Sequence, residues 1–186
     1  MAQYEEQRVG VFVDVSNLYY SARVMYGKKV NFKSVLKEVL GDRRLVRAIA
    51  YVIKAENPEE QKFFDALEDM GYEVKMKDLQ VFYGGHKKGD WDVGIAMDAV
   101  RLAPKLDVVV IASGDGDFIP LIEYLTGIGQ QVEVAAFGRS ASGVARELAD
   151  HFVDLDVDKR KFLIPDRKST TKTTNTTKTN KPKKKE

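Results

Sequence analysis

The sequence contains no cysteine, only two histidines and no apolar run long enough to span a membrane. The absence of cysteine excludes disulfides and thiolate metal sites, and it gives no indication of an oxidising compartment. The histidines, His86 and His151, are too few and too far apart in the sequence to suggest a histidine metal site. The first residues, MAQYEEQR, lack the basic and then apolar pattern of a signal peptide. These absences predict a cytoplasmic protein without a membrane segment.

The net charge of +2 conceals two oppositely charged parts of the chain. Residues 159–186 contain eleven Lys or Arg and two acidic residues, a net charge of +9, whereas residues 1–158 contain 19 basic and 26 acidic residues, a net charge of −7. From residue 164 onward the chain is rich in Thr and Lys and almost free of apolar side chains. We therefore predict one domain over residues 1–163 and a disordered basic tail over residues 164–186. Such a tail either binds nucleic-acid phosphates or acts only as a solubilising extension.

Apolar, strand-like runs alternate with helical patterns through most of the domain. The strand-like runs cover residues 9–15, 44–53, 72–82, 107–113, 131–137 and 151–156. The helical patterns cover residues 31–41, 57–71, 90–104, 118–129 and 140–150, several of them with capping residues at their ends. This alternation predicts an α/β fold, a mostly parallel sheet with helices on both faces. In such a sheet, ligands bind beyond the carboxyl ends of the strands, where the strand order reverses.

Acidic and polar residues follow the first and the fourth predicted strands. The segment VFVDVSN ends the first strand with Asp14 and places Asn17 at the opening of a helix, and IASGDGDF ends the fourth with Ser113, Asp115 and Asp117. Strands one and four are often neighbours in a doubly wound sheet, so we expect these side chains to share a pocket. Two carboxylates about 4 Å apart repel each other by roughly 4 kcal/mol at an effective dielectric constant near 20. A compensating group is therefore expected, and the small residues of SGDGDF would let the backbone approach a metal or phosphate.

A third acidic group lies between these two in the sequence. The segment KKGDWDVGIAMDA places Asp90, Asp92 and Asp98 at the start and middle of a predicted helix. Asp92 and Asp98 are six residues apart, about 120° out of phase on a helix, so both cannot face one ion. We take Asp92 as the inward-facing ligand. Asp98 is either an outer member of the site or a partner of Arg101, three residues further on.

An all-oxygen cluster of aspartates suits a hard cation, Mg²⁺ or Mn²⁺, rather than zinc. One or two such ions polarise a phosphodiester, generate hydroxide from bound water and stabilise the leaving oxygen. The competing interpretation is structural, since Asp115 or Asp117 could cap the helix that follows, and Asn17 and Asp92 could also act as caps. Three separate caps at the ends of the right strands are a less economical explanation than one site.

A basic loop before the third acidic group is a candidate for contact with nucleic acid. It contains Lys87 and Lys88 together with Tyr83, His86 and Trp91. These residues could hold a phosphate backbone and stack a base. The alternative is an ordinary solvated loop with Trp91 packed inward.

The blocks VFVDVSNLY, KKGDWDVGIAMDA and IASGDGDFIPLI resemble, in order and spacing, the signature blocks of NYN-domain proteins in the LabA-like branch of the PIN-like nuclease superfamily. The resemblance covers roughly residues 8–156. It implies a Rossmann-like three-layer α/β/α sandwich and a metal-dependent nuclease that acts mainly on RNA. The site residues that it implies are the metal ligands Asp14, Asp92, Asp115 and Asp117, with Asn17, Ser113 and Asp98 in supporting roles.

Three functional hypotheses follow from these patterns. The first is a ribonuclease dependent on Mg²⁺ or Mn²⁺, predicted to be an endonuclease, whose basic tail and Lys87/Lys88 loop bind RNA. The alternative is a regulatory RNA- or protein-binding module of the LabA type, without turnover. The third, a phosphatase similar to the haloacid dehalogenases, is the weakest, because Ser16 replaces the second aspartate of the nucleophile motif. The sequence leaves the oligomeric state open, a homodimer included.

Overall fold

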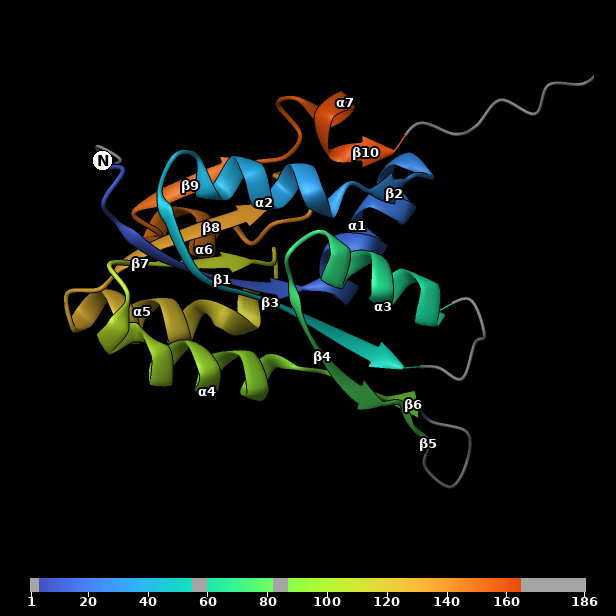
Figure 1. Cartoon of the computed structure of the whole chain (residues 1–186), viewed down its shortest axis with the longest axis horizontal. Helices are drawn as coiled ribbons and strands as arrows, with labels where there is room; N and C mark the ends of the chain where they lie inside the picture. Colours follow the sequence, from blue (N-terminus) through green and yellow to red (C-terminus); the bar gives the residue numbers. More distant parts are fainter. Residues whose placement is uncertain (1–3, 55–59, 82–86, 165–186) are drawn as a thin grey trace, which may run out of the picture.

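The computed structural model describes residues 4–54, 60–81 and 87–164, and its main feature is one parallel sheet (Figure 1). Six strands lie in the order β4-β3-β1-β7-β8-β9, and every neighbouring pair is parallel. The strands are β1 (Arg8–Asp14), β3 (Arg44–Lys54), β4 (Glu73–Asp78), β7 (Val108–Ala112), β8 (Gln131–Ala136) and β9 (His151–Asp154). The predicted α/β fold with a mostly parallel sheet is confirmed.

Helices cover both faces of the sheet and complete a three-layer sandwich (Figure 1). One face carries α1 (Val15–Tyr26), α2 (Phe32–Leu40) and α3 (Glu60–Asp69), and the other carries α4 (Asp92–Leu102), α5 (Ile119–Gly127) and α6 (Gly143–Leu148). The shorter elements are the helices η1 (Ala103–Lys105), η2 (Gly116–Phe118) and α7 (Lys159–Phe162), and the strands β2 (Lys29–Val30), β5 (Gln80–Val81), β6 (Lys87–Lys88) and β10 (Leu163–Ile164).

Alternating side chains of the central strands build two separate cores. In β1, Val11 and Val13 pack under α1 and α2, whereas Phe12 packs under α4 and α5. The same alternation in β7 sends Val110 to the first core and Ile111 to the second. Strands buried on both faces are typical of parallel sheets, and they explain why these segments are nearly continuous apolar runs.

The strand order reverses between β1 and β7, at the centre of the sheet. From β1 the chain proceeds outward to β3 and β4, and from β7 it proceeds outward in the other direction to β8 and β9. The first and fourth predicted strands are therefore neighbours, as expected. Because all six strands are parallel, their carboxyl ends lie at one edge, and the loops after β1 and β7 open side by side there.

The predicted ranges differ from the structure in a few places. The run predicted as a strand over residues 72–82 is divided, because β4 ends at Asp78 and the next residues form β5, which pairs with β6. Ile164, the first residue of the predicted tail, is in β10 and pairs with Lys29 of β2. The remaining residues of the predicted tail lie outside the described ones. Within the described ranges, no helix has both the length and the apolar character that crossing a membrane requires.

Candidate active site

Asp14 ends β1 and connects the strand to α1. Its Oδ1 accepts a hydrogen bond from the backbone N–H of Asn17 at 3.0 Å, which caps the helix, and the Ser113 hydroxyl lies 3.5 Å from its Oδ2. Burial raises the pKa of Asp14 to about 6. The hydrogen bond from Asn17 opposes this shift, and the charges of Asp92 and Asp115 add to it. Asp14 is thus both a helix cap and a carboxylate held in an unfavourable environment.

The loop after β7 is tied to α1 through Asn17. The Asn17 side-chain oxygen accepts a hydrogen bond from the Gly114 N–H at 2.9 Å, so Asn17 joins α1 to this loop and does not cap a helix. Ser113 is 2% exposed, and its hydroxyl accepts from the Asp115 N–H at 3.2 Å. Asp115 caps η2 by accepting from the Asp117 N–H at 3.0 Å. These bonds hold the Ser113–Asp117 segment beside the end of β1.

Gly114 is needed for packing within the protein. A Cβ placed on it would lie 3.0 Å from the Ala141 Cα and 3.3 Å from the Ala136 Cβ. The close approach that its size allows is therefore to the segment after β8. The expectation that the small residues of this segment admit a metal or phosphate stays a prediction.

Asp92 is the first residue of α4 and points toward the same edge of the sheet. The helix begins after Trp91 without a side-chain cap, so the Asp92 carboxylate is not used for capping. Partial burial raises the pKa of Asp92, the charges of Asp90, Asp115 and Asp117 raise it further, and Lys77 opposes the shift. The negative charges of the loop after β7 therefore act on Asp92.

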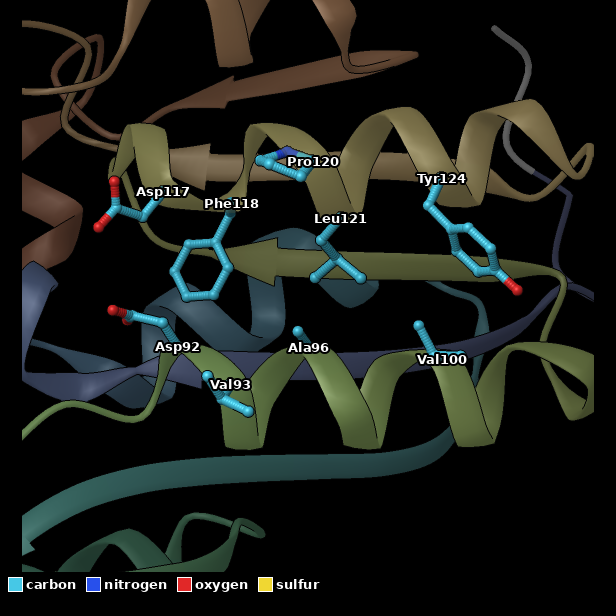
Figure 2. A pocket seen from close by; sticks show the side chains of 9 residues that line it. All are labelled: Asp92, Val93, Ala96, Val100, Asp117, Phe118, Pro120, Leu121 and Tyr124. Carbon is cyan, nitrogen blue, oxygen red and sulfur yellow. The ribbon is translucent and has the colours of Figure 1, made fainter.

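A hollow of about 320 Å³ extends from these carboxylates between α4 and α5. Figure 2 shows Asp92 and Asp117 at one end of it, on facing elements, and Tyr124 at the other. The side chains between them are apolar and include Phe118 and Leu121. The acidic edge of the sheet thus continues into an apolar groove.

The structure brings together carboxylates from three separate segments: Asp14, Asp92, and the pair Asp115 and Asp117. Among the described residues, no lysine or arginine forms an ion pair with any of these four. In the same part of the chain, no three acidic or histidine side chains are already arranged as a metal-binding group. Binding of an ion would therefore require these carboxylates to move toward it.

Asp98 faces a different set of partners. Its Oδ2 accepts hydrogen bonds from the Tyr51 hydroxyl at 2.8 Å and from Lys75 Nζ at 2.6 Å. Partial burial acts to raise the pKa of Asp98, but these two bonds and the charge of Arg101 outweigh it and lower the pKa. Its direct contacts tie α4 to β3 and β4, and it does not join the four clustered carboxylates.

Trp91 packs inward. Its Nε1 donates to the Val52 carbonyl at 2.8 Å, and its ring lies 5.3 Å from the Tyr51 ring. Lys77 lies over Trp91 at 5.8 Å and donates to the Asp90 carbonyl at 3.0 Å. Lys77 was not among the predicted site residues, because a lysine within an alternating strand pattern carries no signal of its own.

The predicted RNA-binding loop is described only in part. The backbone of Lys87 and Lys88 forms β6, whereas Tyr83 and His86 lie outside the described residues.

Comparisons with known proteins agree with this architecture. A family model described as NYN domain matches residues 8–156. The low amplitude and bright protein LabA of Synechococcus elongatus is 27% identical over 168 residues, covering 86% of this chain and 89% of LabA. The crystal structure of a Vibrio parahaemolyticus protein of unknown function superposes with a TM-score of 0.79 at 33% identity, covering 88% of this chain and 100% of that one.

Proposed function

The chain belongs to the NYN domain family of the PIN-like nuclease superfamily, and from this membership we propose that it is a ribonuclease dependent on Mg²⁺ or Mn²⁺. The proposed reaction is hydrolysis of RNA phosphodiester bonds, with an endonucleolytic mode. The proposed site is the carboxyl edge of the sheet between β1 and β7, the position where this sheet architecture binds ligands.

One observation carries the proposal: four carboxylates from three distant segments interact at this edge, and none of them forms an ion pair with a described lysine or arginine. Capping explains Asp14 and Asp115, but it does not explain Asp92 or why all of them converge. Such an arrangement is unfavourable until a divalent ion neutralises it. Oxygen-only ligands of this kind suit Mg²⁺ and Mn²⁺.

In the proposed site, Asp14, Asp92 and Asp115 hold the ion, and Asp117 provides a further carboxylate. A bound ion would polarise the phosphodiester and lower the pKa of a water molecule. Ser113 and Asn17 position the loop after β7, through their bonds to the Asp115 and Gly114 N–H groups.

Asp98 has a supporting role in this proposal. Through Lys75 and Tyr51 it fixes the helix that presents Asp92 to the edge of the sheet. The basic residues of the tail and of the Lys87/Lys88 loop would bind the phosphates of the RNA, an interaction that salt weakens.

The direct test is cleavage of labelled single-stranded and structured RNA with Mn²⁺, comparing the wild type with Asp14→Asn. Asn keeps an oxygen for the helix cap but removes the charge, so we expect at least a 100-fold loss, roughly 3 kcal/mol of transition-state stabilisation. Asp107→Asn is the matched control, because Asp107 lies at the opposite end of the sheet and pairs with Arg8. Equal cleavage by the wild type and Asp14→Asn would show that the proposed site is wrong.

A regulatory module of the LabA type is the second candidate. It is favoured by the similarity to LabA and by the carboxylates not being arranged in advance around an ion. Calorimetry separates the two functions. The ribonuclease requires uptake of Mg²⁺ or Mn²⁺, at least when RNA is bound, together with cleavage. RNA binding without ion uptake or cleavage would favour the module.

A further inference from the structure

A second and larger hollow, of about 710 Å³, lies on the other face of the sheet. It is bounded by α1, α3 and the paired strands β2 and β10, which lie near one another in Figure 1. We call it the α1–α3 groove. Its volume is within the range of pockets that hold a molecule the size of a nucleotide.

Aromatic side chains line the α1–α3 groove. Tyr19 and Phe63 are partly exposed in it, and Tyr20 is 65% exposed. The Tyr19 and Tyr20 rings meet edge to face at 5.6 Å. Exposed aromatic rings in a concave surface are the groups on which proteins stack unpaired bases.

Three residues that line the groove lie next in the chain to the proposed active site or to the basic tail. Val15 and Ser16, which line it, directly follow Asp14 in the chain. Ile164 also lines it, and the tail continues from that residue. The lining of the groove is therefore close in the chain to Asp14, which belongs to the proposed active site, and to the basic residues of the tail, which would attract phosphates.

The charges of the groove differ in sign from those of the carboxylate cluster. Its charged side chains are those of Lys29, Lys62 and Glu60, which give it a net positive charge. A polyanionic strand that approaches the acidic edge of the sheet would gain favourable contacts with the lysines of the groove.

The tail of the chain itself is a poorer occupant. Residues 165–186 contain no apolar side chain except two prolines, and they carry eight Lys or Arg against two acidic residues. Such a segment has no side chain with which to fill an aromatic groove, and lysines in the groove would repel it. A flat base with an attached phosphate matches both the rings and the lysines.

We propose that the α1–α3 groove holds an unpaired base of the RNA strand whose phosphodiester lies at the carboxylate cluster, with Tyr20 as the main stacking residue. This inference rests on the proposed function and specifies its substrate. A base that is paired in a duplex cannot insert into the groove, so the preferred substrate is single-stranded RNA.

The test measures affinity by fluorescence anisotropy with the full chain in EDTA, so that binding is separated from cleavage. The ligands are an oligouridylate and an abasic oligoribonucleotide of equal length, and the variants are Tyr20→Ala and Tyr20→Phe. Tyr4→Ala is the matched control, because Tyr4 is 66% exposed and lies outside the groove.

We expect Tyr20→Ala to weaken oligouridylate binding about tenfold and to leave abasic binding within twofold, because stacking needs a base. Tyr20→Phe keeps the ring and should bind within twofold of the wild type, as should Tyr4→Ala. Unchanged affinity in Tyr20→Ala, or an equal loss with both ligands, would overturn the proposal.

Cleavage is assayed separately, so the two proposals can fail independently. Cleavage by the wild type with unaltered affinity in Tyr20→Ala would remove the base site and leave the ribonuclease. A base-dependent loss of affinity without any cleavage would leave the base site and remove the ribonuclease.

Discussion

Two groups of carboxylates, at opposite ends of the central sheet, differ in their partners. At the carboxyl end, Asp14, Asp92, Asp115 and Asp117 face one another. Toward the amino end, three carboxylates close to strand starts pair with arginines: Asp107 with Arg8, Glu73 with Arg47 and Glu133 with Arg43. The three carboxylates toward the amino end are compensated by ion pairs, whereas the four clustered carboxylates form no ion pair with a described lysine or arginine.

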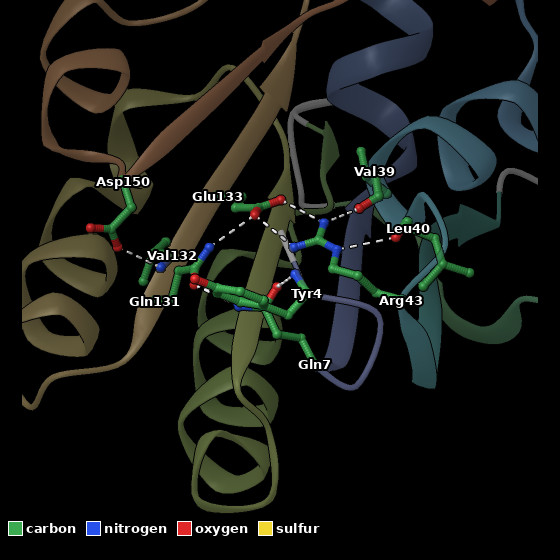
Figure 3. A network of polar contacts seen from close by, with 9 residues as sticks. All are labelled: Tyr4, Gln7, Val39, Leu40, Arg43, Gln131, Val132, Glu133 and Asp150. Carbon is green, nitrogen blue, oxygen red and sulfur yellow. Dashed lines mark hydrogen bonds and ion pairs between the residues drawn. The ribbon is translucent and has the colours of Figure 1, made fainter. Parts of the chain in front are cut away.

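The most buried of these pairs joins Arg43 to Glu133, on β8 (Figure 3). Arg43 is 5% exposed and Glu133 is 1% exposed, and two parallel bonds of 2.7 and 2.9 Å connect them. Arg43 also donates to the carbonyls of Val39 and Leu40, and Gln131 donates to Glu133. Every charge in this network is matched, so burial does not leave an isolated ion.

The comparison indicates which end is shaped by folding and which by function. Natural proteins retain unfavourable interactions mainly where a ligand will relieve them. The amino end should therefore lose stability when a charge is removed, whereas the carboxyl end should gain stability. The following predictions test this difference, from the largest expected effect to the smallest.

The largest effect is expected from Arg43→Met. The substitution leaves Glu133 charged and buried without a partner, so we expect a loss of about 3 to 5 kcal/mol in the free energy of unfolding, measured by urea denaturation. Replacing both residues with apolar ones, Arg43→Met with Glu133→Leu, should recover most of the loss. If the free energy of unfolding of Arg43→Met lay within about 1 kcal/mol of the wild-type value, the buried charge of Glu133 would not depend on Arg43.

Removing a charge from the carboxylate cluster should raise the free energy of unfolding instead of lowering it. In EDTA at pH 8, we expect Asp14→Asn to stabilise the protein by as much as roughly 3 kcal/mol, because the pKa of Asp14 is raised to about 6 from an ordinary 3.8. Urea denaturation of both proteins measures the difference. Asp107→Asn, which removes an arginine-paired charge at the amino end, should give no stabilisation. Destabilisation by Asp14→Asn would mean that its capping role dominates.

Divalent ions should relieve the same repulsion. At an ion concentration about 100 times the dissociation constant, Mg²⁺ or Mn²⁺ should stabilise the wild type by about 2 to 3 kcal/mol, seen as a rise in Tm. The rise should be smaller at pH 5, where Asp14 is mostly protonated, than at pH 8. Asp14→Asn should show little of it. A rise of equal size in both proteins would place ion binding elsewhere.

The smallest effect is the pH dependence that Asp14 imposes in EDTA. Between pH values of about 4 and 6, the folded protein binds more protons at Asp14 than the unfolded one, so its contribution to stability falls as the pH rises. The slope is at most about 1.4 kcal/mol per pH unit. The difference in unfolding free energy between the wild type and Asp14→Asn isolates it, and a flat difference curve would contradict the raised pKa.

The arginine-paired carboxylates give stability the opposite dependence on pH. Hydrogen bonds from Arg8 hold the pKa of Asp107 at about 2, so the stabilisation from this group is present above a pH of about 4 and is lost as the pH falls toward 2. The two ends of the sheet thus have opposite signs of pH dependence, in different pH ranges.

Much of the fold could be predicted because its signals are local. The apolar runs of the six sheet strands and the caps at Asn31 and Gly41 depend on short segments, and the structure confirms them. The pairing of β2 with β10 joins residues far apart in the chain through two-residue strands, which leave no periodic pattern. It could not be predicted for that reason.

The convergence of the candidate aspartates could be predicted, but not all of their contacts. The sequence placed Asp14, Asp115 and Asp117 at strand ends and Asp92 at the start of a helix, and the structure brings these four together. The sequence left two alternatives for Asp98, Arg101 or an outer position in the site, and its hydrogen bonds go instead to Lys75 and Tyr51, on two other strands. Which distant strand passes beside a helix depends on packing, which a local pattern does not encode.

The sequence by itself determined the parallel α/β architecture, the family and the carboxylates at the strand ends, because period and residue type are properties of short segments. Only the tertiary structure decided which charges are matched. It paired Arg43 with Glu133, brought the four carboxylates together at the other end, and formed the α1–α3 groove on one face of the sheet. Electrostatic interactions and grooves depend on distances between segments that are remote in the chain, and folding alone sets those distances.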